Sequence, residues 1–247
     1  MSKPVLYIFT ISHYCEKARW ALTHLGIDAE VRILAPGTHL QVAQGLGLKR
    51  GSVPFLQDGD RVIQGSDEII SWAEKQAKGE QSLGSHNQDV LAIEKRLDDK
   101  LGVHIRRWFY SEAIIECPHT VKPIFMEGLS IWEKVKLTIK WPVICKLMIK
   151  RMDLGYQQGL ESLAIVEEEI TWLESLIDHE DSFLVGDSLT RADIAAASLL
   201  APLVGPMEYS CSKLMTLPPR AIEQSVGMDE RVFWRWVNQV YHTHRER

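Results

Sequence analysis

The chain has 247 residues, of which 45% are hydrophobic and 25% are charged, and its formal net charge at pH 7 is −5. These values are those of an ordinary globular protein and exclude the disordered and collagen-like classes. The length is enough for one large domain or two modest ones. The negative net charge argues against nucleic acid as a partner.

The cysteines and the apolar segments indicate the compartment. Cys15, Cys117, Cys145 and Cys211 are widely spaced and form no CxxC pair, which is typical of free thiols in a reducing compartment. No apolar segment reaches the roughly 20 residues that a membrane span requires. The first apolar run lacks a cleavage site of small residues, so it is not read as a signal peptide. We therefore expect a cytoplasmic protein without a transmembrane span.

The first third of the chain predicts an α/β unit. Residues 5–10 and 30–34 have the pattern of strands, and residues 15–25 between them have that of a helix. A looser polar stretch follows, and residues 55–63 then form a hairpin around an Asp-Gly-Asp turn. Ser66 is placed to cap the next helix. These elements predict a mixed four-stranded sheet with helices packed on it.

The remainder of the chain predicts helices. Residues 79–87 (GEQSLGSHN) are small and polar, as in a linker. Beyond them strand signals almost vanish, and apolar residues recur every three or four positions over 160–177. We therefore predict an α/β domain over 1–80 and an all-helical domain over 88–247.

A capping box opens the most apolar helix of the second half. The hydroxyl of Thr190 and the carboxylate of Asp193 are spaced to satisfy the first backbone amides reciprocally. Residues 194–203 are almost wholly apolar. Such a helix belongs at the centre of a helical domain.

Ser12 is the first candidate functional residue. It lies between the first strand and the first helix, where unpaired backbone amides and the helix dipole favour negative charge. An anion or a thiolate could be held at this position. The alternative is that Ser12 only caps the helix.

Residues 9–22 (FTISHYCEKARWAL) resemble the active-site segment of glutaredoxins and glutathione transferases. Ser12 matches the nucleophilic cysteine of glutaredoxins and Cys15 the resolving one, but the match to transferases with a catalytic serine is closer. The step Val53-Pro54 resembles the Val–cis-Pro step of thioredoxin-like folds. Residues 183–203 (FLVGDSLTRADIAAASLLAPL) look like the C-terminal segment of the transferases.

The resemblance implies the glutathione transferase architecture, a thioredoxin-like N-terminal domain followed by an all-α C-terminal domain. It implies a cytosolic, homodimeric detoxification enzyme whose catalytic serine, Ser12, favours the thiolate of glutathione for attack on a small apolar electrophile. The residues that it implies for binding glutathione are Val53, Pro54, Gln64, Ser66 and Asp67.

The match to the family has one clear departure. Gly65 stands where many members have a glutamate that contacts the amine of glutathione, so Gln64 or Asp67 would have to replace it. Cys15 and Tyr7 are alternatives to Ser12 for activating the thiol, since other transferase classes use a tyrosine near the end of the first strand. The apolar surroundings of Tyr7 favour a core role.

The pocket for the electrophile should lie between the domains, against the first long helix of the second half. In that helix, His104, Arg107 and Tyr110 are the candidates, and His13 and Tyr7 are candidates on the first domain. No metal site is expected, because the pair His242-x-His244 lacks a third ligand at a suitable spacing.

A basic helical insertion near 130–155 is the least ordinary feature. Residues 132–152 (WEKVKLTIKWPVICKLMIKRM) carry five lysines and one arginine against a single glutamate. A membrane-surface helix or a cover over the substrate channel would explain them. The simpler interpretation, which we favour at this point, is a pair of helices with solvated lysines and a kink at Pro142.

Two other functions stay open on the sequence. A glutathione-dependent thiol transferase or disulfide reductase would use Cys15, although no cysteine stands at position 12 to pair with it. A non-catalytic, transferase-like protein that holds apolar ligands would fit Gly65 and the basic insertion.

Overall fold

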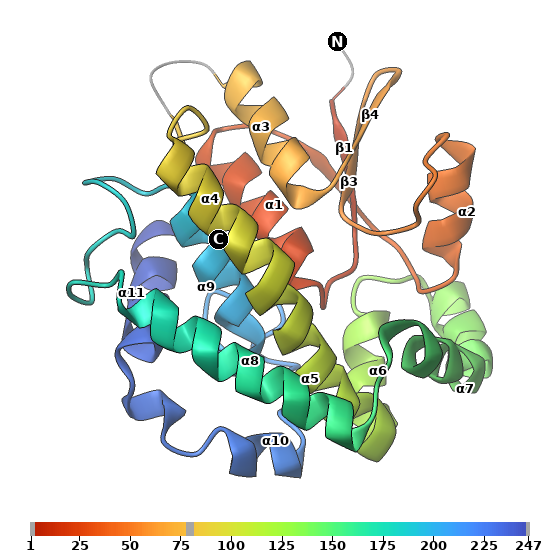
Figure 1. Ribbon diagram of the computed structural model, residues 1–247. Helices are drawn as coiled ribbons and strands as arrows, with labels where there is room; N and C mark the ends of the chain where they lie inside the picture. Colours follow the sequence, from red (N-terminus) through yellow and green to blue (C-terminus); the bar gives the residue numbers. More distant parts are fainter. Residues whose placement is uncertain (1–2, 78–81, 246–247) are drawn as a thin grey trace.

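The computed structural model describes residues 3–77 and 82–245 (Figure 1). Part of the expected linker, residues 79–81, lies outside the described residues. The division into domains over 1–80 and 88–247 therefore stays a prediction.

A four-stranded mixed sheet forms the N-terminal part, as predicted. Its strands are β1 (Val5–Ile8), β2 (Glu30–Ile33), β3 (Phe55–Asp58) and β4 (Arg61–Gln64), in the order β2-β1-β3-β4. β1 runs parallel to β2 and antiparallel to β3, and β3 and β4 form the expected hairpin. The parallel pair requires the crossover helix that the sequence predicted between them.

Helices α1 (His13–His24) and α3 (Ser66–Gln76) pack on one face of this sheet, and α2 (Thr38–Gly45) lies on the other side (Figure 1). The sequence missed α2, because Ala43 is its only buried residue and it therefore shows little apolar periodicity. The expectation that Ser66 caps α3 is wrong by one residue. Gly65 is the cap and Ser66 is the first helical residue.

The described residues beyond α3 form helices and no strand. The helices are α4 (Gln88–Arg96), a π-helical turn (Leu97–Leu101), α5 (Gly102–Glu116), α6 (Pro118–Met126), α7 (Ile131–Met152), α8 (Tyr156–Glu174), α9 (Arg191–Val204), α10 (Pro219–Gln224), a 3₁₀ turn (Met228–Glu230) and α11 (Val232–His244). The apolar repeat over 160–177 lies mainly in α8. The basic segment is one continuous helix, α7, instead of the expected pair, and it contains Pro142.

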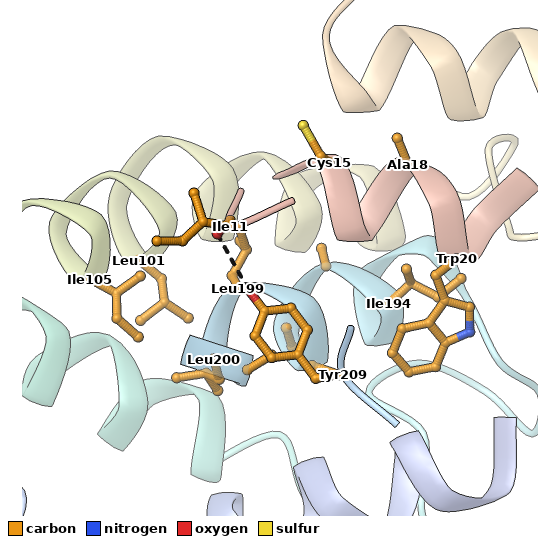
Figure 2. Close-up of a cluster of buried hydrophobic side chains, with 14 of the residues drawn as sticks. Ile11, Cys15, Ala18, Trp20, Leu101, Ile105, Ile194, Leu199, Leu200 and Tyr209 are labelled. Carbon is orange, nitrogen blue, oxygen red and sulfur yellow. Dashed lines mark hydrogen bonds between the residues drawn. The ribbon is translucent and has the colours of Figure 1, made fainter. Parts of the chain in front are cut away.

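The capping box of α9 forms as predicted. The backbone N–H and the hydroxyl of Thr190 donate to Asp193 Oδ2 at 2.7 and 2.6 Å, and every residue of α9 is buried. Figure 2 shows side chains of α9 packed between those of α1 and α5, beside the hydrogen bond from Tyr209 to the carbonyl of Ile11. α9 therefore joins the sheet part of the molecule to the helical part.

Candidate functional site

Two cavities lie next to each other where the sheet part faces α5. The apolar cavity, of about 310 Å³, is lined mainly by Phe9, Ile11, Ile105, Phe109, Tyr110, Phe125, Ile144, Met148 and Met152. The polar cavity, of about 630 Å³, is lined mainly by Tyr14, Pro54, Ser66, Asp67, Glu94, Lys95, Asp98, Asp99 and Arg191. Ser52, Val53 and Arg106 line both cavities, so the two share one wall.

Ser12 lies at the N-terminus of α1 and lines the apolar cavity. Its backbone is extended, and its Oγ accepts a hydrogen bond from the backbone N–H of Cys15 at 3.4 Å. A hydroxyl has one proton to donate besides its acceptor lone pairs. Ser12 can therefore cap α1 with its oxygen and still donate its proton toward the cavity, so the two interpretations of this residue are compatible.

Cys15 lies one helical turn further along α1 and is buried. Burial raises the pKa of its thiol to about 12, and the hydrogen bond with Ser12 offsets only part of this effect. The thiolate is the reactive form of cysteine. Cys15 is therefore an unreactive thiol at neutral pH.

The loop before β3 forms the wall common to the two cavities. The Val53-Pro54 peptide bond is cis, and Val53 lines both cavities while Pro54 lines the polar one. Gln64 holds this loop, because its Nε2 donates to the carbonyl oxygens of Arg50 and Ser52 at 2.9 and 2.8 Å. Gln64 itself lies outside both linings, so it positions the loop.

The N-terminus of α3 faces the polar cavity, with Ser66 buried and Asp67 exposed at its lining. Gly65 has a φ of 105°, which favours glycine, and a Cβ added there would lie 2.7 Å from Asp67 Oδ1. The positive φ and the closeness of Asp67 thus explain why position 65 is occupied by glycine and not by a residue with a side chain. The first amides of a helix lack partners within it and attract carboxylates.

A buried ion-pair cluster forms the base of the polar cavity and was not foreseen. Lys17 Nζ of α1 lies 2.8 Å from Glu94 Oε1 and 2.5 Å from Asp98 Oδ2. Arg191 Nε of α9 lies 2.5 Å from Glu94 Oε2. Burial raises the pKa of Asp98 to about 6, although Lys17 opposes this shift. The cluster ties α1, α4 and α9 together, and no local sequence pattern brings its members to one place.

Arg106 of α5 is the functional candidate that the sequence reasoning missed. It lines both cavities, and its Nε is buried without a hydrogen-bond partner among the described residues. The sequence offered Arg107 instead, which points away from the cavities and donates from its Nε to the carbonyl of Asp153 at 3.0 Å. Neighbouring residues of an α-helix differ by about 100° in direction. Only the orientation of α5 about its own axis decides which of the two arginines faces the cavities.

His13 and Tyr110 line the apolar cavity, and both side chains are buried. Burial and the nearby charge of Arg106 lower the pKa of His13 to about 3. The imidazole is therefore neutral at physiological pH, and its Nε2 has no partner among the described residues. Burial raises the pKa of Tyr110, so its hydroxyl also stays protonated.

Tyr7 and His104 line neither cavity. Tyr7 donates its hydroxyl to Gln57 Oε1 at 3.2 Å and stacks on Phe55, which places it on the α2 side of the sheet, because side chains along β1 alternate between faces. The Nδ1 of His104 lies 3.2 Å from Ser162 Oγ of α8. Both side chains are used in packing between secondary-structure elements.

Comparison with known families finds a match in the N-terminal third of the chain. Residues 6–81 match the model of the family described as glutathione S-transferase, N-terminal domain. This segment of the chain is therefore similar to the N-terminal domain of glutathione S-transferases. This match covers the sheet, α1, α3 and the shared loop of the two cavities.

Solved structures extend the likeness to the whole chain, at the level of the fold. Glutathione transferase GSTFuA3 of Phanerochaete chrysosporium aligns over 100% of this chain and 99% of its own, with a TM-score of 0.65 and 13% identity. The β-etherase LigF of Sphingobium sp. strain SYK-6 aligns over 96% and 98%, with a TM-score of 0.58 and 17% identity. Glutaredoxin 2 of Salmonella typhimurium, solved with glutathione, aligns over 99% and 100%, with a TM-score of 0.54 and 17% identity. Comparison with curated proteins finds no significant match.

Helix α7 covers the apolar cavity. Ile144, Leu147, Met148, Arg151 and Met152 from its C-terminal half line that cavity. The basic segment thus has a structural role beyond carrying solvated lysines. Within the part of the chain that the structure describes, no group of His, Cys, Asp or Glu side chains could hold a metal ion.

Proposed function

We propose that the protein conjugates the thiolate of glutathione to small apolar electrophiles, with Ser12 stabilising the thiolate. The observation that carries this proposal is the shared wall of the two cavities. A charged tripeptide in the polar cavity would bring its thiol to Val53, beside the apolar cavity that Ser12 lines. The volumes of the cavities, about 310 and 630 Å³, are of the order typical of small-molecule sites, about 300–1,000 Å³.

The polar cavity offers groups that suit each end of glutathione. The backbone amides at Ser66 would bind the γ-glutamyl carboxylate of glutathione. Asp67, which has no ion pair among the described residues, would bind the amine of glutathione, for which Gly65 offers no side chain. The backbone of Val53 would pair with the cysteinyl part. Arg106 would bring a positive charge to the wall between the cavities.

The energy that thiolate formation requires is modest. Lowering a thiol pKa from ~8.5 by two units requires ~2.7 kcal/mol of preferential stabilisation of the thiolate. A hydrogen bond to a charged acceptor supplies about 1.5–3 kcal/mol, and the charge of Arg106 adds to it. The thiolate would then attack the electrophilic carbon, forming a C–S bond as the leaving group departs with its electron pair.

A conjugation assay with glutathione and a generic aryl halide tests this proposal. Replacing Ser12 by alanine should lower kcat/KM by about 10- to 100-fold, the equivalent of one hydrogen bond to a charged group. Ser12→Thr, which keeps a hydroxyl and a helix cap, is the matched control and should keep most of the activity. Equal rates in the wild type and Ser12→Ala would refute the role of Ser12.

The burial of Cys15 weighs against the disulfide-reductase alternative. Because the pKa of Cys15 is raised, its thiol stays protonated, whereas disulfide reduction requires a thiolate. Calorimetric binding of glutathione without turnover of any electrophile would instead favour the non-catalytic binding protein.

We place the enzyme in the cytoplasm, as a detoxifying homodimer that pairs the sheet domain of one chain with the helical domain of the other. The four unpaired cysteines support a reducing compartment. The proposed division into domains over 1–80 and 88–247 goes with this assembly. Sedimentation velocity would give the oligomeric state directly.

A further inference from the structure

Helix α7 carries apolar side chains on two opposite faces. Its inner face packs into the molecule through Leu137, Trp141 and Cys145, which are buried. Its outer face exposes six large apolar side chains, of which Ile131, Trp132 and Ile139 are 78%, 76% and 74% exposed. The full set is Ile131, Trp132, Val135, Ile139, Val143 and Leu147. Of these, Leu147 lies at the edge of the outer face and also lines the apolar cavity.

These six side chains form one stripe. From Val135 to Leu147 they recur every fourth residue, a spacing that keeps them along one side of an α-helix. Single exposed apolar residues are common in proteins, but a continuous apolar row on a surface marks an interaction site. Figure 1 shows α7 at the periphery, on the side of the molecule where α2 lies.

Positive charge accompanies the stripe. α7 carries Lys134, Lys136, Lys140, Lys146, Lys150 and Arg151, all of them exposed. Against the single acid Glu133 they give a local charge of +5 (six cations minus one anion) in a chain whose net charge is −5. None of the six forms an ion pair with another described residue, whereas Glu133 is held by the capping box with Ser130.

We propose that the outer face of α7 binds the surface of an anionic phospholipid membrane, with the helix axis parallel to the bilayer. An apolar row with lysines beside it, and a tryptophan at one end, is the pattern of a helix that lies in the membrane interface. Long lysine side chains can keep their ammonium groups at the headgroups while their stems cover apolar surface. α7 is not a membrane span, since no helix among the described residues is long and apolar enough for that.

Charge complementarity favours a lipid surface over the same helix of a second copy. Two α7 faces in contact would bring twelve cations together, which is repulsive. An anionic bilayer instead presents many negative charges in one plane and an apolar layer just beneath them.

The inner side of the same helix lines the apolar cavity through Ile144, Met148 and Met152. Binding through the outer face would therefore set that cavity close to the lipid layer, where small apolar compounds concentrate. This consequence rests on the proposed function, whereas membrane binding itself does not.

Vesicle co-sedimentation of the whole protein, without glutathione or substrate, tests the proposal. Vesicles of phosphatidylcholine with phosphatidylserine should bind at least about tenfold more protein than vesicles of phosphatidylcholine alone, and added salt should weaken the binding. Equal binding to the two kinds of vesicle, or none to either, would overturn the proposal.

Two charge-matched triple variants locate the binding surface. Lys136→Glu/Lys140→Glu/Lys146→Glu on α7 should lose most of the binding. Lys49→Glu/Lys75→Glu/Lys213→Glu changes the net charge equally at exposed positions elsewhere and should keep it. Equal losses in the two variants would mean that the net charge, and not α7, drives the binding.

The apolar stripe is tested separately through Trp132. Brominated lipids should quench part of the tryptophan fluorescence of the wild type, and Trp132→Phe should remove that part while circular dichroism stays unchanged. Quenching that is unaffected by Trp132→Phe would contradict the proposed orientation. A different result would be a wild type that binds no vesicles and forms a dimer that dissociates when the α7 lysines are changed to glutamate. That result would show that the outer face of α7 binds a second copy of the chain.

Discussion

The two cavities of this protein differ in how the chain builds them. One wall of the polar cavity is formed by backbone features and short-range motifs, namely the Val53-Pro54 step and the N-terminus of α3 at Ser66, while its base is formed by side chains of α4 and α9. The apolar cavity is formed mainly by side chains of the helices α5 and α7, together with side chains near the start of the chain such as Phe9 and Ile11. Recognition of a constant, charged ligand can rely on backbone groups, whereas recognition of an apolar one depends on side chains that vary freely.

The largest expected effect concerns the ion-pair cluster under the polar cavity. Glu94→Ala should destabilise the fold by about 3–5 kcal/mol, because it leaves the buried cations Lys17 and Arg191 without their shared partner. Urea denaturation measures this loss. Lys95→Ala, which breaks the exposed pair with Asp99, is the control and should cost less than about 1 kcal/mol. Similar costs for the two variants would show that the buried cluster does not stabilise the fold.

The next effect tests the wall between the cavities. Arg106→Met should lower kcat/KM for conjugation by about 10- to 100-fold, since it removes a cation next to the proposed thiolate site. Arg107→Met removes the same charge one residue along, on the side of α5 that contacts Asp153. It should leave kcat/KM nearly unchanged, and an equal loss in both variants would contradict the assignment to Arg106.

The buried side chain of His13 should make the stability of the fold decrease at acidic pH. Its pKa is lowered to about 3 in the folded protein, below the value of ~6.5 for an unperturbed histidine. The unfolded chain therefore binds a proton first as the pH falls below about 6.5, and the free energy of unfolding decreases by up to ~1.4 kcal/mol per pH unit down to about pH 3. Denaturation of the wild type and of His13→Asn between pH 7 and 4 gives the free energy of unfolding of each protein. The excess stability of the wild type over the variant should decrease as the pH falls. A constant difference would refute the shifted pKa.

The smallest effect separates the two cavities kinetically. Met148→Ala shortens a side chain of α7 that lines only the apolar cavity. The KM for the electrophile should rise about 2- to 10-fold, in line with the loss of a few buried apolar atoms, while the KM for glutathione stays constant. A parallel rise in both constants would mean that the cavities do not act separately.

The sequence predicted the parts of the molecule that local patterns encode. The hairpin of β3 and β4 follows from its Asp-Gly-Asp turn, and the capping box from Thr190 and Asp193, because each depends on residues a few positions apart. Helix α2 was missed, since it buries only Ala43 and shows no clear period.

The sequence could not predict features that depend on the relative placement of distant elements. Arg106 and Arg107 are equivalent by composition, and only the packing of α5 decides which of them faces the cavities. The cluster of Lys17, Glu94 and Arg191 likewise joins three helices that no motif connects. The direction of the Tyr7 side chain, which points toward α2, also depends on the register of β1 in the sheet.

The central claim is that Ser12 stabilises the thiolate of glutathione at the wall between the cavities. A pH titration of the ultraviolet thiolate absorbance of glutathione, bound to the wild type and to Ser12→Ala, tests this claim most directly. We expect the pKa of the bound thiol to lie about two units below its free value of ~8.5 in the wild type, and to return most of the way to that value in Ser12→Ala. A bound thiol with the pKa of free glutathione, or a lowered pKa that Ser12→Ala leaves unchanged, would contradict the account.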